Sequence, residues 1–496
     1  MLIILTGLPG TGKSTVAGAL ARELGAAVLS TDKIRAEKRG RPGFSRAEKG
    51  GVYERLFARA ERGLRDGRSL VLDGTFYLRR LREAGAAVGR RAGVPVFVVE
   101  VISPVAVVKR RMERRSSRTR GPRPAGFEVH RFIRRSYEPV RSRHLTLDTT
   151  HPGTWRRDLV PVANAMRVVE NDRRIVAPLR RSRGMRLIQT HISWILLDGA
   201  RAYKIKKPVR FSFVDYTTPA RRLFYCRREI AVNSRLSPEL YLGVVPVRDD
   251  AGVVSFGGPG RTVDHAVEMV EMPQGSRLDR LVAQGRVGPD DIMRIVRRLC
   301  AFHAEARPAA RRYGSPRAVR EGFDHAFRLK ALIERELGAG AALERIEEKV
   351  DGFLLSHAAL FRERVRQGRI RHCHGDLRMS NIFLDGGEVR IFDAVEFNPG
   401  LASTDVAADV AYLAMDLRYC GKRGLAERLI DSYAECAGDE GLRALTDFYQ
   451  CYRALVRLLV ESLAIADPAI GARRKRGARQ AARRYLALAE AFARRL

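Results

Sequence analysis

The chain has 496 residues, of which 45% are hydrophobic and 30% are charged. This length allows two or three domains with full hydrophobic cores, and the composition excludes an intrinsically disordered chain. The formal net charge of +36 attracts polyanions in general, but arginine is spread along the whole chain and no basic tail or RNA-binding signature stands out.

No stretch of the sequence indicates a membrane or secreted protein. The longest apolar runs, such as residues 94–102, are too short to span a bilayer, and residues 2–5 lack the basic flank of a signal peptide. We therefore expect a cytoplasmic protein without a membrane partner. Six scattered cysteines lack CxxC spacing, so neither a disulfide framework nor a zinc site is predicted.

Short apolar runs alternate with amphipathic stretches over the first 170 residues. Strands are predicted over residues 2–5, 27–29, 70–72, 96–102 and 145–147. Helical patterns lie between them, for example over residues 52–64, and another helix is predicted near residues 155–169. This alternation predicts an α/β fold, a doubly wound parallel sheet with helices on both faces. The arginine-rich stretch 171–186 is interpreted as a linker.

A phosphate-binding motif directly follows the first predicted strand and opens a helix. Residues 7–14 read Gly-Leu-Pro-Gly-Thr-Gly-Lys-Ser and fit GxxxxGK[ST]. The glycines let backbone N–H groups converge on phosphates, and the helix N-terminus adds positive potential. We expect Lys13 to reach the β- and γ-phosphates of ATP and the Ser14 hydroxyl to bind Mg²⁺. The predicted nucleotide-binding residues here are Gly7, Gly10, Thr11, Gly12, Lys13, Ser14 and Thr15.

Two further strand ends carry carboxylates, and ligands of such sheets bind beyond the carboxyl ends of the strands. Asp32 follows the second strand, with Arg35 about one helical turn later, and Asp73 follows the third. We assign Asp32 as the base that accepts a substrate hydroxyl proton, Arg35 as a substrate clamp and Asp73 as a Walker-B-like ligand of Mg²⁺ through water. A simple helix cap is the alternative role for Asp32.

Through about residue 169 the chain resembles small P-loop kinases that phosphorylate hydroxyl groups, the group around gluconate kinases, polynucleotide kinases and zeta toxins. In that group an Asp-x-x-Arg after the second strand handles the substrate, which Asp32 and Arg35 match. A lid helix with spaced arginines covers the γ-phosphate, and residues 111–115 match that pattern, so Arg115 is a candidate nucleotide contact. A solvated helix face is the alternative. The resemblance does not transfer the identity of the acceptor.

From about residue 187 the pattern changes to hairpins, and after residue 278 it becomes mostly helical. Strands over residues 192–197 and 202–205 pair around a turn. Thr218 is the predicted N-cap of a helix that begins at Pro219 and runs through residue 235.

Residues 374–381 read His-Gly-Asp-Leu-Arg-Met-Ser-Asn and have the D-L-x-x-x-N spacing of a kinase catalytic loop. We expect Asp376 to accept the proton of the incoming hydroxyl and Asn381 to bind Mg²⁺. A hairpin over residues 382–392 then delivers Asp393 as a second metal ligand.

A site of this kind also needs a strand lysine and a helix glutamate. Lys204 and Lys206 lie on one face of a predicted strand. We prefer Lys204 as the ATP contact and keep Lys206 as the alternate. Glu229 is the predicted partner, with an ordinary surface pair as its alternative role.

Other residues are assigned around this predicted loop. Arg453 and Arg457 lie four apart on one helix and are interpreted either as a clamp for an anionic substrate or as structural support for the loop. Asp409 is predicted to brace the loop, and His303 is interpreted as a core histidine with satisfied hydrogen bonds.

From about residue 187 to the C-terminus the chain resembles the aminoglycoside-phosphotransferase-like family, in a bacterial branch that occurs fused to a P-loop kinase. The matching stretches are residues 202–209, 241–246, 374–377, 392–398, 405–409 and 452–457. The resemblance implies a bilobal protein-kinase-like α+β domain, with an N-lobe over about 187–272 and a C-lobe over 273–496.

The combined prediction is an ATP-dependent phosphotransferase with two nucleotide sites. Its first domain covers residues 1–170, its linker 171–186 and its second domain 187–496. ATP and Mg²⁺ are the expected cofactors, and a small polar hydroxyl compound is the expected acceptor. A nucleic-acid-end kinase with an auxiliary second domain is less favoured, as is a chain in which one domain senses nucleotide. The sequence leaves the oligomeric state open.

Overall fold

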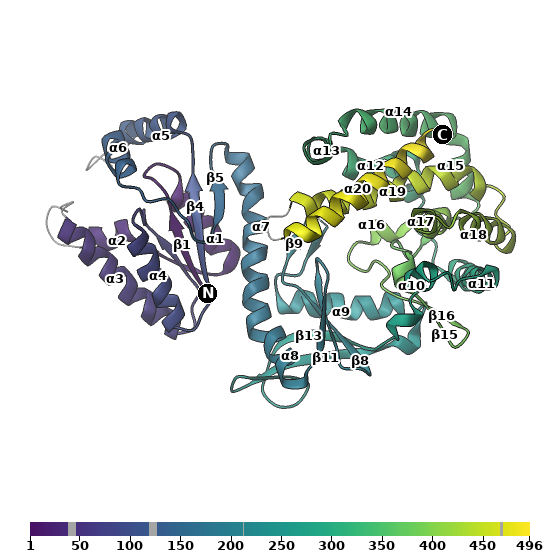
Figure 1. Cartoon of the computed structure of the whole chain (residues 1–496), viewed down its shortest axis with the longest axis horizontal. Coiled ribbons are helices and arrows are strands. Elements are labelled where there is room, and N and C mark those ends of the chain that lie inside the picture. Colours follow the sequence, from purple (N-terminus) through teal and green to yellow (C-terminus); the bar gives the residue numbers. More distant parts are fainter. Residues whose placement is uncertain (38–45, 119–125, 212, 467–469) are drawn as a thin grey trace.

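The computed structural model describes residues 1–37, 46–118, 126–211, 213–466 and 470–496 (Figure 1). The chain begins with a five-stranded parallel sheet in the order β2-β3-β1-β4-β5. Its strands are β1 (Leu2–Thr6), β2 (Ala27–Ser30), β3 (Leu70–Asp73), β4 (Val96–Ile102) and β5 (Leu145–Asp148). The predicted parallel sheet is confirmed, and each strand lies within one residue of its predicted bounds.

Helices cover both faces of this sheet. They are α1 (Lys13–Leu24), α2 (Thr31–Ala36), α3 (Arg46–Arg65), α4 (Arg79–Arg91), α5 (Val105–Arg118), α6 (Phe127–Arg135) and α7 (Pro152–Asn171). Leu2 and Ile4 of β1 are fully buried in one apolar cluster, and Ile3 and Leu5 are fully buried in another. A strand with both faces buried is apolar at every position, which explains the unbroken run at the start of the sequence.

The stretch predicted as a linker is helical. It consists of the end of α7, a π-helical turn (Asp172–Val176) and α8 (Ala177–Arg183). Ile175, Val176 and Leu179 are buried in a cluster with strands of the following sheet. The many arginines give the segment a polar composition, but its apolar face belongs to the core of the second sheet.

A six-stranded antiparallel sheet follows, in the order β12-β11-β13-β8-β7-β6. Its strands are β6 (Arg186–Gln189), β7 (Ser193–Leu197), β8 (Arg201–Lys206), β11 (Tyr241–Asp250), β12 (Val253–Phe256) and β13 (Arg261–Val270). A short pair, β9 (Arg210–Phe211) and β10 (Val214–Asp215), precedes α9 (Pro219–Asn233), which packs on β13 and β11. Thr218 caps α9 by accepting a hydrogen bond from the Arg221 amide, so the predicted cap is confirmed.

The rest of the chain is mainly helical. Its helices are α10 (Leu278–Ala283), α11 (Pro289–Glu305), α12 (Pro316–Phe327), α13 (Lys330–Leu337), α14 (Gly340–Ser356), α15 (Ala358–Arg366), α16 (Pro399–Ala402), α17 (Val406–Tyr419), α18 (Arg423–Cys436), α19 (Leu442–Ala466) and α20 (Ala472–Ala493). α17 and α19 lie at the centre of its core, and no helix among the described residues has the length and apolar character to cross a membrane. The bilobal kinase-like fold stays a prediction for this half.

Two short antiparallel strand pairs interrupt the helices, and the second of them is a hairpin. β14 (Ile370–His372) pairs with β17 (Ser403–Asp405), and β15 (Ile382–Asp385) pairs with β16 (Glu388–Ile391). The second pair is the predicted hairpin between Asn381 and Asp393. Both candidate metal ligands therefore lie beside the open end of this hairpin.

Contacts join the two sheets through α7, which lies between them in Figure 1. The Glu23 carboxylate at the end of α1 accepts hydrogen bonds from Arg167 of α7 at 2.7 Å and from Arg210 of β9 at 2.8 Å. The Asn164 side chain of α7 also bonds the backbone N–H and C=O of Arg210. The helix that follows the phosphate-binding loop is thus tied to α7 and to the short β9–β10 pair.

Candidate active sites

The glycine-rich loop between β1 and α1 has the backbone that phosphate binding requires. Gly10 and Gly12 have φ angles of 85° and 90°, in the left-handed region that favours glycine. A Cβ on Gly7 would lie 2.3 Å from Val101 O, so only glycine fits there. Gly12 is the N-cap of α1, and the free N–H groups of the first helical turn face the loop.

Lys13 lies inside this loop. Its ammonium donates to Leu8 O at 2.8 Å, and the side chain is buried. Burial lowers the pKa of Lys13 to about 8, with Asp73 and Asp32 opposing the shift. An anion beside Lys13 would stabilise its charged form, as expected for a lysine that contacts phosphate.

Asp73 and Ser14 lie together at the carboxyl end of the sheet. Burial raises the pKa of the Asp73 carboxyl, while a hydrogen bond with Ser14 and the Lys13 ammonium oppose that rise. A hydroxyl and a carboxylate are both oxygen ligands that suit Mg²⁺. The structure therefore brings together the two residues predicted as metal ligands of the first site.

Asp32 and Arg35 lie at the start of α2. Ser30 is the N-cap of that helix, and its hydroxyl accepts a hydrogen bond from the Asp32 amide, so Asp32 is not the cap. The Asp32 carboxylate is 78% exposed and accepts from Arg35 at 3.2 Å. An exposed carboxylate remains open to a substrate hydroxyl.

Helix α5 packs on the phosphate-binding loop. A Cβ on Gly10 would lie within 3 Å of the Val108 and Met112 side chains. Arg111 donates to the hydroxyl and carbonyl of Thr149, and the Thr149 hydroxyl donates to Thr11 O at 2.7 Å. Arg111 therefore supports the loop through Thr149, a residue that no local motif indicated.

Arg115 lies one helical turn beyond Arg111 and is exposed. Its proposed contact with nucleotide stays a prediction.

In the second half, the loop that carries Asp376 lies between β14 and β15. The Asn381 side-chain N–H donates to Asp376 O at 3.0 Å and to Asp376 Oδ2 at 3.3 Å. Arg378 Nε lies 3.1 Å from both Asp376 carboxylate oxygens. Sequence reasoning missed Arg378, although it lies within the motif, because the spacing rule treats that position as variable.

Asp393 lies next to this loop with an uncommon backbone. Its φ angle is 65°, in the left-handed region that non-glycine residues rarely adopt. Lys204 Nζ lies 2.6 Å from Asp393 Oδ1 and 2.7 Å from Glu229 Oε1. Burial would raise the pKa of Asp393, but the Lys204 ammonium outweighs it and the pKa lies below the ordinary value. The structure thus brings together the predicted lysine, glutamate and aspartate.

Lys206 lies in a different, enclosed environment. It is fully buried, with its ammonium 2.7 Å from Glu229 Oε2 and 2.5 Å from Glu396 Oε1. The Tyr216 hydroxyl donates to the same Glu396 oxygen at 3.0 Å. Of the two lysines, only Lys204 bonds the candidate metal ligand Asp393, so the geometry favours Lys204 as the phosphate contact and gives Lys206 a structural role.

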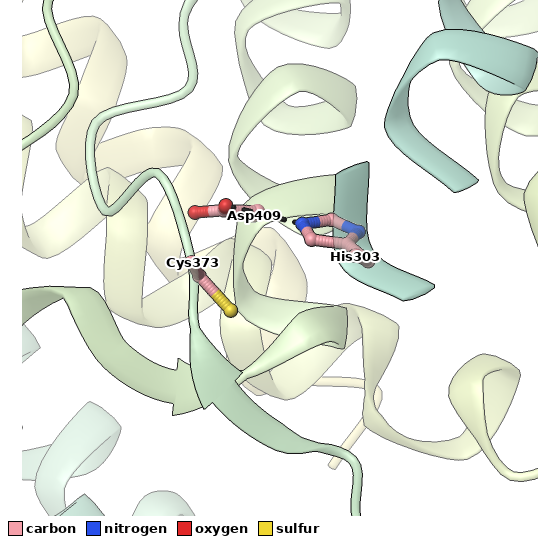
Figure 2. A group of neighbouring side chains, drawn as sticks. All are labelled: His303, Cys373 and Asp409. Atoms are coloured by element: carbon pink, nitrogen blue, oxygen red, sulfur yellow. Dashed lines mark hydrogen bonds and ion pairs between the residues drawn. The ribbon is translucent and has the colours of Figure 1, made fainter. Parts of the chain in front are cut away.

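Asp409 braces the candidate catalytic loop, and Figure 2 shows its side chain close to the segment that carries Cys373. Its carboxylate accepts from the amides of His374 at 2.6 Å and Gly375 at 2.9 Å. Burial would raise the pKa of Asp409, but the bond with His303 and nearby positive charge lower it to about 2. The predicted bracing role of Asp409 is confirmed by these contacts.

His303, Cys373 and Asp409 also form a buried group of metal-ligating types whose ligand atoms lie within 4.8 Å (Figure 2). His303 bonds the Tyr433 hydroxyl at 2.7 Å and Asp409 at 3.3 Å. The Cys373 thiol donates to Thr404 O at 3.4 Å. A metal here would compete with the loop amides and with His303 for the Asp409 oxygens, so these contacts favour a structural cluster, with His303 satisfied as predicted.

Arg453 and Arg457 are both engaged by protein groups. Arg453 donates to Gly375 O at 3.0 Å and is 5% exposed. Arg457 pairs with Glu461 at 3.1 Å and stacks over Tyr485 of α20. A clamp formed by the two side chains together is therefore not present, and Arg453 takes the alternative role of supporting the catalytic loop.

Comparison with protein families finds a match for the first part of the chain. A family described as an AAA domain matches residues 2–140, which lie within the predicted P-loop domain. A UPF0200 protein of Aeropyrum pernix is 36% identical over 131 residues, which cover 24% of this chain and 66% of that protein.

Uncharacterized proteins of Mycobacterium tuberculosis and Mycobacterium bovis are each 34% identical over 279 residues. The aligned region covers 55% of this chain and 54% of each of those proteins. The chain thus spans about half the length of these curated relatives.

Solved structures resemble about a third of the chain. A putative kinase from Chloroflexus aurantiacus is 24% identical with a TM-score of 0.28, covering 32% of this chain and 95% of that one. The APS kinase of Mycobacterium tuberculosis is 24% identical with a TM-score of 0.26, and the match covers 32% of this chain and 94% of that one. A gluconokinase from Sinorhizobium meliloti is 16% identical with a TM-score of 0.28, and the match covers 33% of this chain and 91% of that one.

Proposed function

We propose that this protein is an ATP-dependent phosphotransferase with two nucleotide sites, each of which transfers the γ-phosphoryl group of ATP to a hydroxyl of a small polar acceptor. The observation that carries the proposal is the group of Asp376, Asn381, Asp393 and Lys204 around one hairpin. It combines a carboxylate for the hydroxyl, oxygen ligands for a cation and a lysine for phosphate. The phosphate-binding loop supplies the corresponding groups in the first half.

The residues present fit ATP with Mg²⁺ at both sites. The loop of the first site offers converging N–H groups, the Lys13 ammonium and the Ser14 and Asp73 oxygens. The second site offers oxygens of Asn381 and Asp393. When bound, Mg²⁺ neutralises phosphate charge and orients the γ-phosphoryl group.

Asp376 has the central role in the second site. The acceptor oxygen forms a bond to the γ-phosphorus, the bond from that phosphorus to the bridging oxygen breaks, and ADP leaves. Asp376 takes the proton of the acceptor hydroxyl. Arg378 and Asn381 hold the Asp376 carboxylate in place, and Lys204, oriented by Glu229, stabilises the charge on the phosphates.

In the first site, Asp32 takes the corresponding role of base, and Arg35 orients the acceptor. Lys13 and the amides at the start of α1 bind the phosphates. The exposure of Asp32 leaves room for an acceptor at the edge of the sheet.

The net charge of +36 favours one alternative, a kinase that acts on nucleic-acid ends. Affinity for a nucleic acid that contacts many phosphates would fall steeply with salt. Affinity for a small acceptor would change far less.

The test is a screen of hydroxyl acceptors with γ-labelled ATP on the full chain. We expect labelled product from at least one small polar compound, and D376N or K13A should remove the product made at its own site. D385N, which changes an aspartate at the far end of the hairpin, is the matched control and should leave both products. Products that survive in both D376N and K13A would refute the assignment of the sites.

A further inference from the structure

A cavity of about 450 Å³ lies between α12, residues 398–404 and α19. Two of its wall residues contact Gly375, which directly precedes Asp376. The Arg453 guanidinium donates to Gly375 O at 3.0 Å, and Leu401 O lies 3.1 Å from the position that a Gly375 Cβ would take. The cavity therefore borders the candidate catalytic loop, and its volume is typical of small-molecule sites.

Positive side chains dominate the charged part of the wall. Arg312, Arg317 and Arg453 line the cavity with one carboxylate, Glu321. Arg317 and Glu321 form an exposed pair at 3.2 Å, a kind of pair that contributes little. Across the described residues, neither Arg312 nor Arg453 pairs with a carboxylate, and Arg453 Nε has no hydrogen-bond partner. The Arg312 and Arg317 guanidinium groups are therefore available to an anion, whereas Arg453 is buried against the catalytic loop.

Aromatic rings form much of the remaining wall. Tyr313, Tyr449 and Tyr452 line the cavity. The Arg312 guanidinium lies 4.9 Å from the Tyr313 ring centre, and Arg453 lies 5.1 Å from that of Tyr452. A tyrosine offers an apolar ring face and a polar hydroxyl. This combination suits a sugar-sized ligand with C–H faces and hydroxyl groups.

From these contacts we infer that the cavity binds the acceptor of the second site, and that this acceptor is a sugar-sized hydroxyl compound carrying a phosphate or a carboxylate. The inference rests on the proposed function, since it takes Asp376 as the base. Guanidinium groups bind both kinds of anion through paired hydrogen bonds. A cationic amino sugar would meet the guanidinium groups of Arg312 and Arg317. This class is therefore excluded as the preferred acceptor, although the second half of the chain resembles the aminoglycoside-phosphotransferase-like family.

The test measures binding to the full chain by calorimetry, without ATP turnover. Four probes share the glucopyranose ring and differ in one substituent that sets the charge: glucose 6-phosphate, glucuronate, glucose and glucosamine. Saturating Mg·ADP occupies the nucleotide sites, so that a sugar phosphate cannot bind the glycine-rich loop. We expect at least one anionic probe to bind about tenfold or more tightly than glucose, and glucosamine to bind more weakly than glucose. The stronger anionic probe identifies the phosphate or the carboxylate as the recognised group.

Two variants locate the binding. R312A/R317A should weaken the anionic probe about tenfold or more and leave glucose unchanged. R328A is the matched control, because Arg328 lies just beyond α12, is 72% exposed and does not line the cavity. R328A should bind like the unmodified protein.

Equal affinity for the anionic and neutral probes, or unchanged binding in R312A/R317A, would overturn the inference. Phosphoryl transfer to a neutral acceptor with no preference for anions would overturn it too, while the proposed function would stand. Binding of an anionic probe without any transfer from ATP would instead count against the proposed function.

Discussion

Replacing Lys206 with methionine tests how much the buried ion pairs of the second sheet contribute to stability. The Lys206 ammonium is fully buried, contacts Glu229 and Glu396 and lies 5.1 Å from the Tyr216 ring centre. Methionine fills most of the same volume but removes the charge. Glu229 keeps Lys204 as a partner, whereas among the described residues Glu396 keeps only the hydrogen bond from the Tyr216 hydroxyl. Stranding one partner of a buried pair costs about 3–5 kcal/mol, which we expect as the loss in unfolding free energy.

The assay uses the fluorescence of Trp194 during guanidinium denaturation. Trp194 is 1% exposed and pairs with Ile205 in the neighbouring strand, next to Lys206. The chain has two tryptophans, so a W155F background makes Trp194 the sole reporter of this sheet.

A second variant separates charge from packing. K206M/E396Q removes the stranded carboxylate and should recover about 2 kcal/mol or more of the loss. K330M is the control, since Lys330 pairs with Glu344 at the surface, and its loss should stay below about 1 kcal/mol. A K206M loss below about 1 kcal/mol, or no recovery in the double variant, would refute the reasoning.

Three further predictions concern the sites and their boundary. Nucleotide affinity of the first site should fall as pH rises through about 8, because the Lys13 pKa of about 8 makes the free lysine neutral above that pH. K13R should give a flat profile from pH 7 to 10 in the same titrations, and a flat wild-type profile would contradict the prediction. D376N should lower kcat about 10²-fold with little change in ATP affinity, whereas D393N should weaken Mg·ATP binding itself, and steady-state kinetics with equilibrium titration distinguish the two. Full activity of both variants would rule out these roles. A fragment that begins at Gly184 should melt at a lower temperature by circular dichroism than one that begins at Asn171, because it lacks the buried residues of α8 and the preceding turn. Equal melting temperatures would mean that this helix adds nothing to the second sheet.

The parts of the fold that were predictable are those with local causes. The order of strands and helices in the first half follows from periodicity, and residues 7–14 form their loop because glycine spacing fixes the backbone locally. The loop of residues 374–381 was equally predictable from the sequence, because Asp376 and Asn381 lie only five residues apart.

The unpredicted parts depend on contacts between distant residues. Glu396 lies 190 residues from Lys206, so no local rule connects them. Thr149 reaches Thr11 across 138 residues and is otherwise an ordinary polar residue after a strand. The helix over residues 171–183 was missed because arginines obscured its three buried apolar side chains. Charge patterning describes the exposed face of such a helix, whereas the opposite face determines where it packs.

The brace at Asp409 has a consequence for tolerance of acid. Its folded-state pKa of about 2 lies below the ordinary value of 3.8. The stabilisation that its ionised carboxylate gives to the His374 and Gly375 amides is therefore complete above about pH 4 and disappears only as the pH falls towards 2. The loop that carries Asp376 keeps this support throughout the mildly acidic range. A loss of activity near pH 5 would therefore not come from release of this loop.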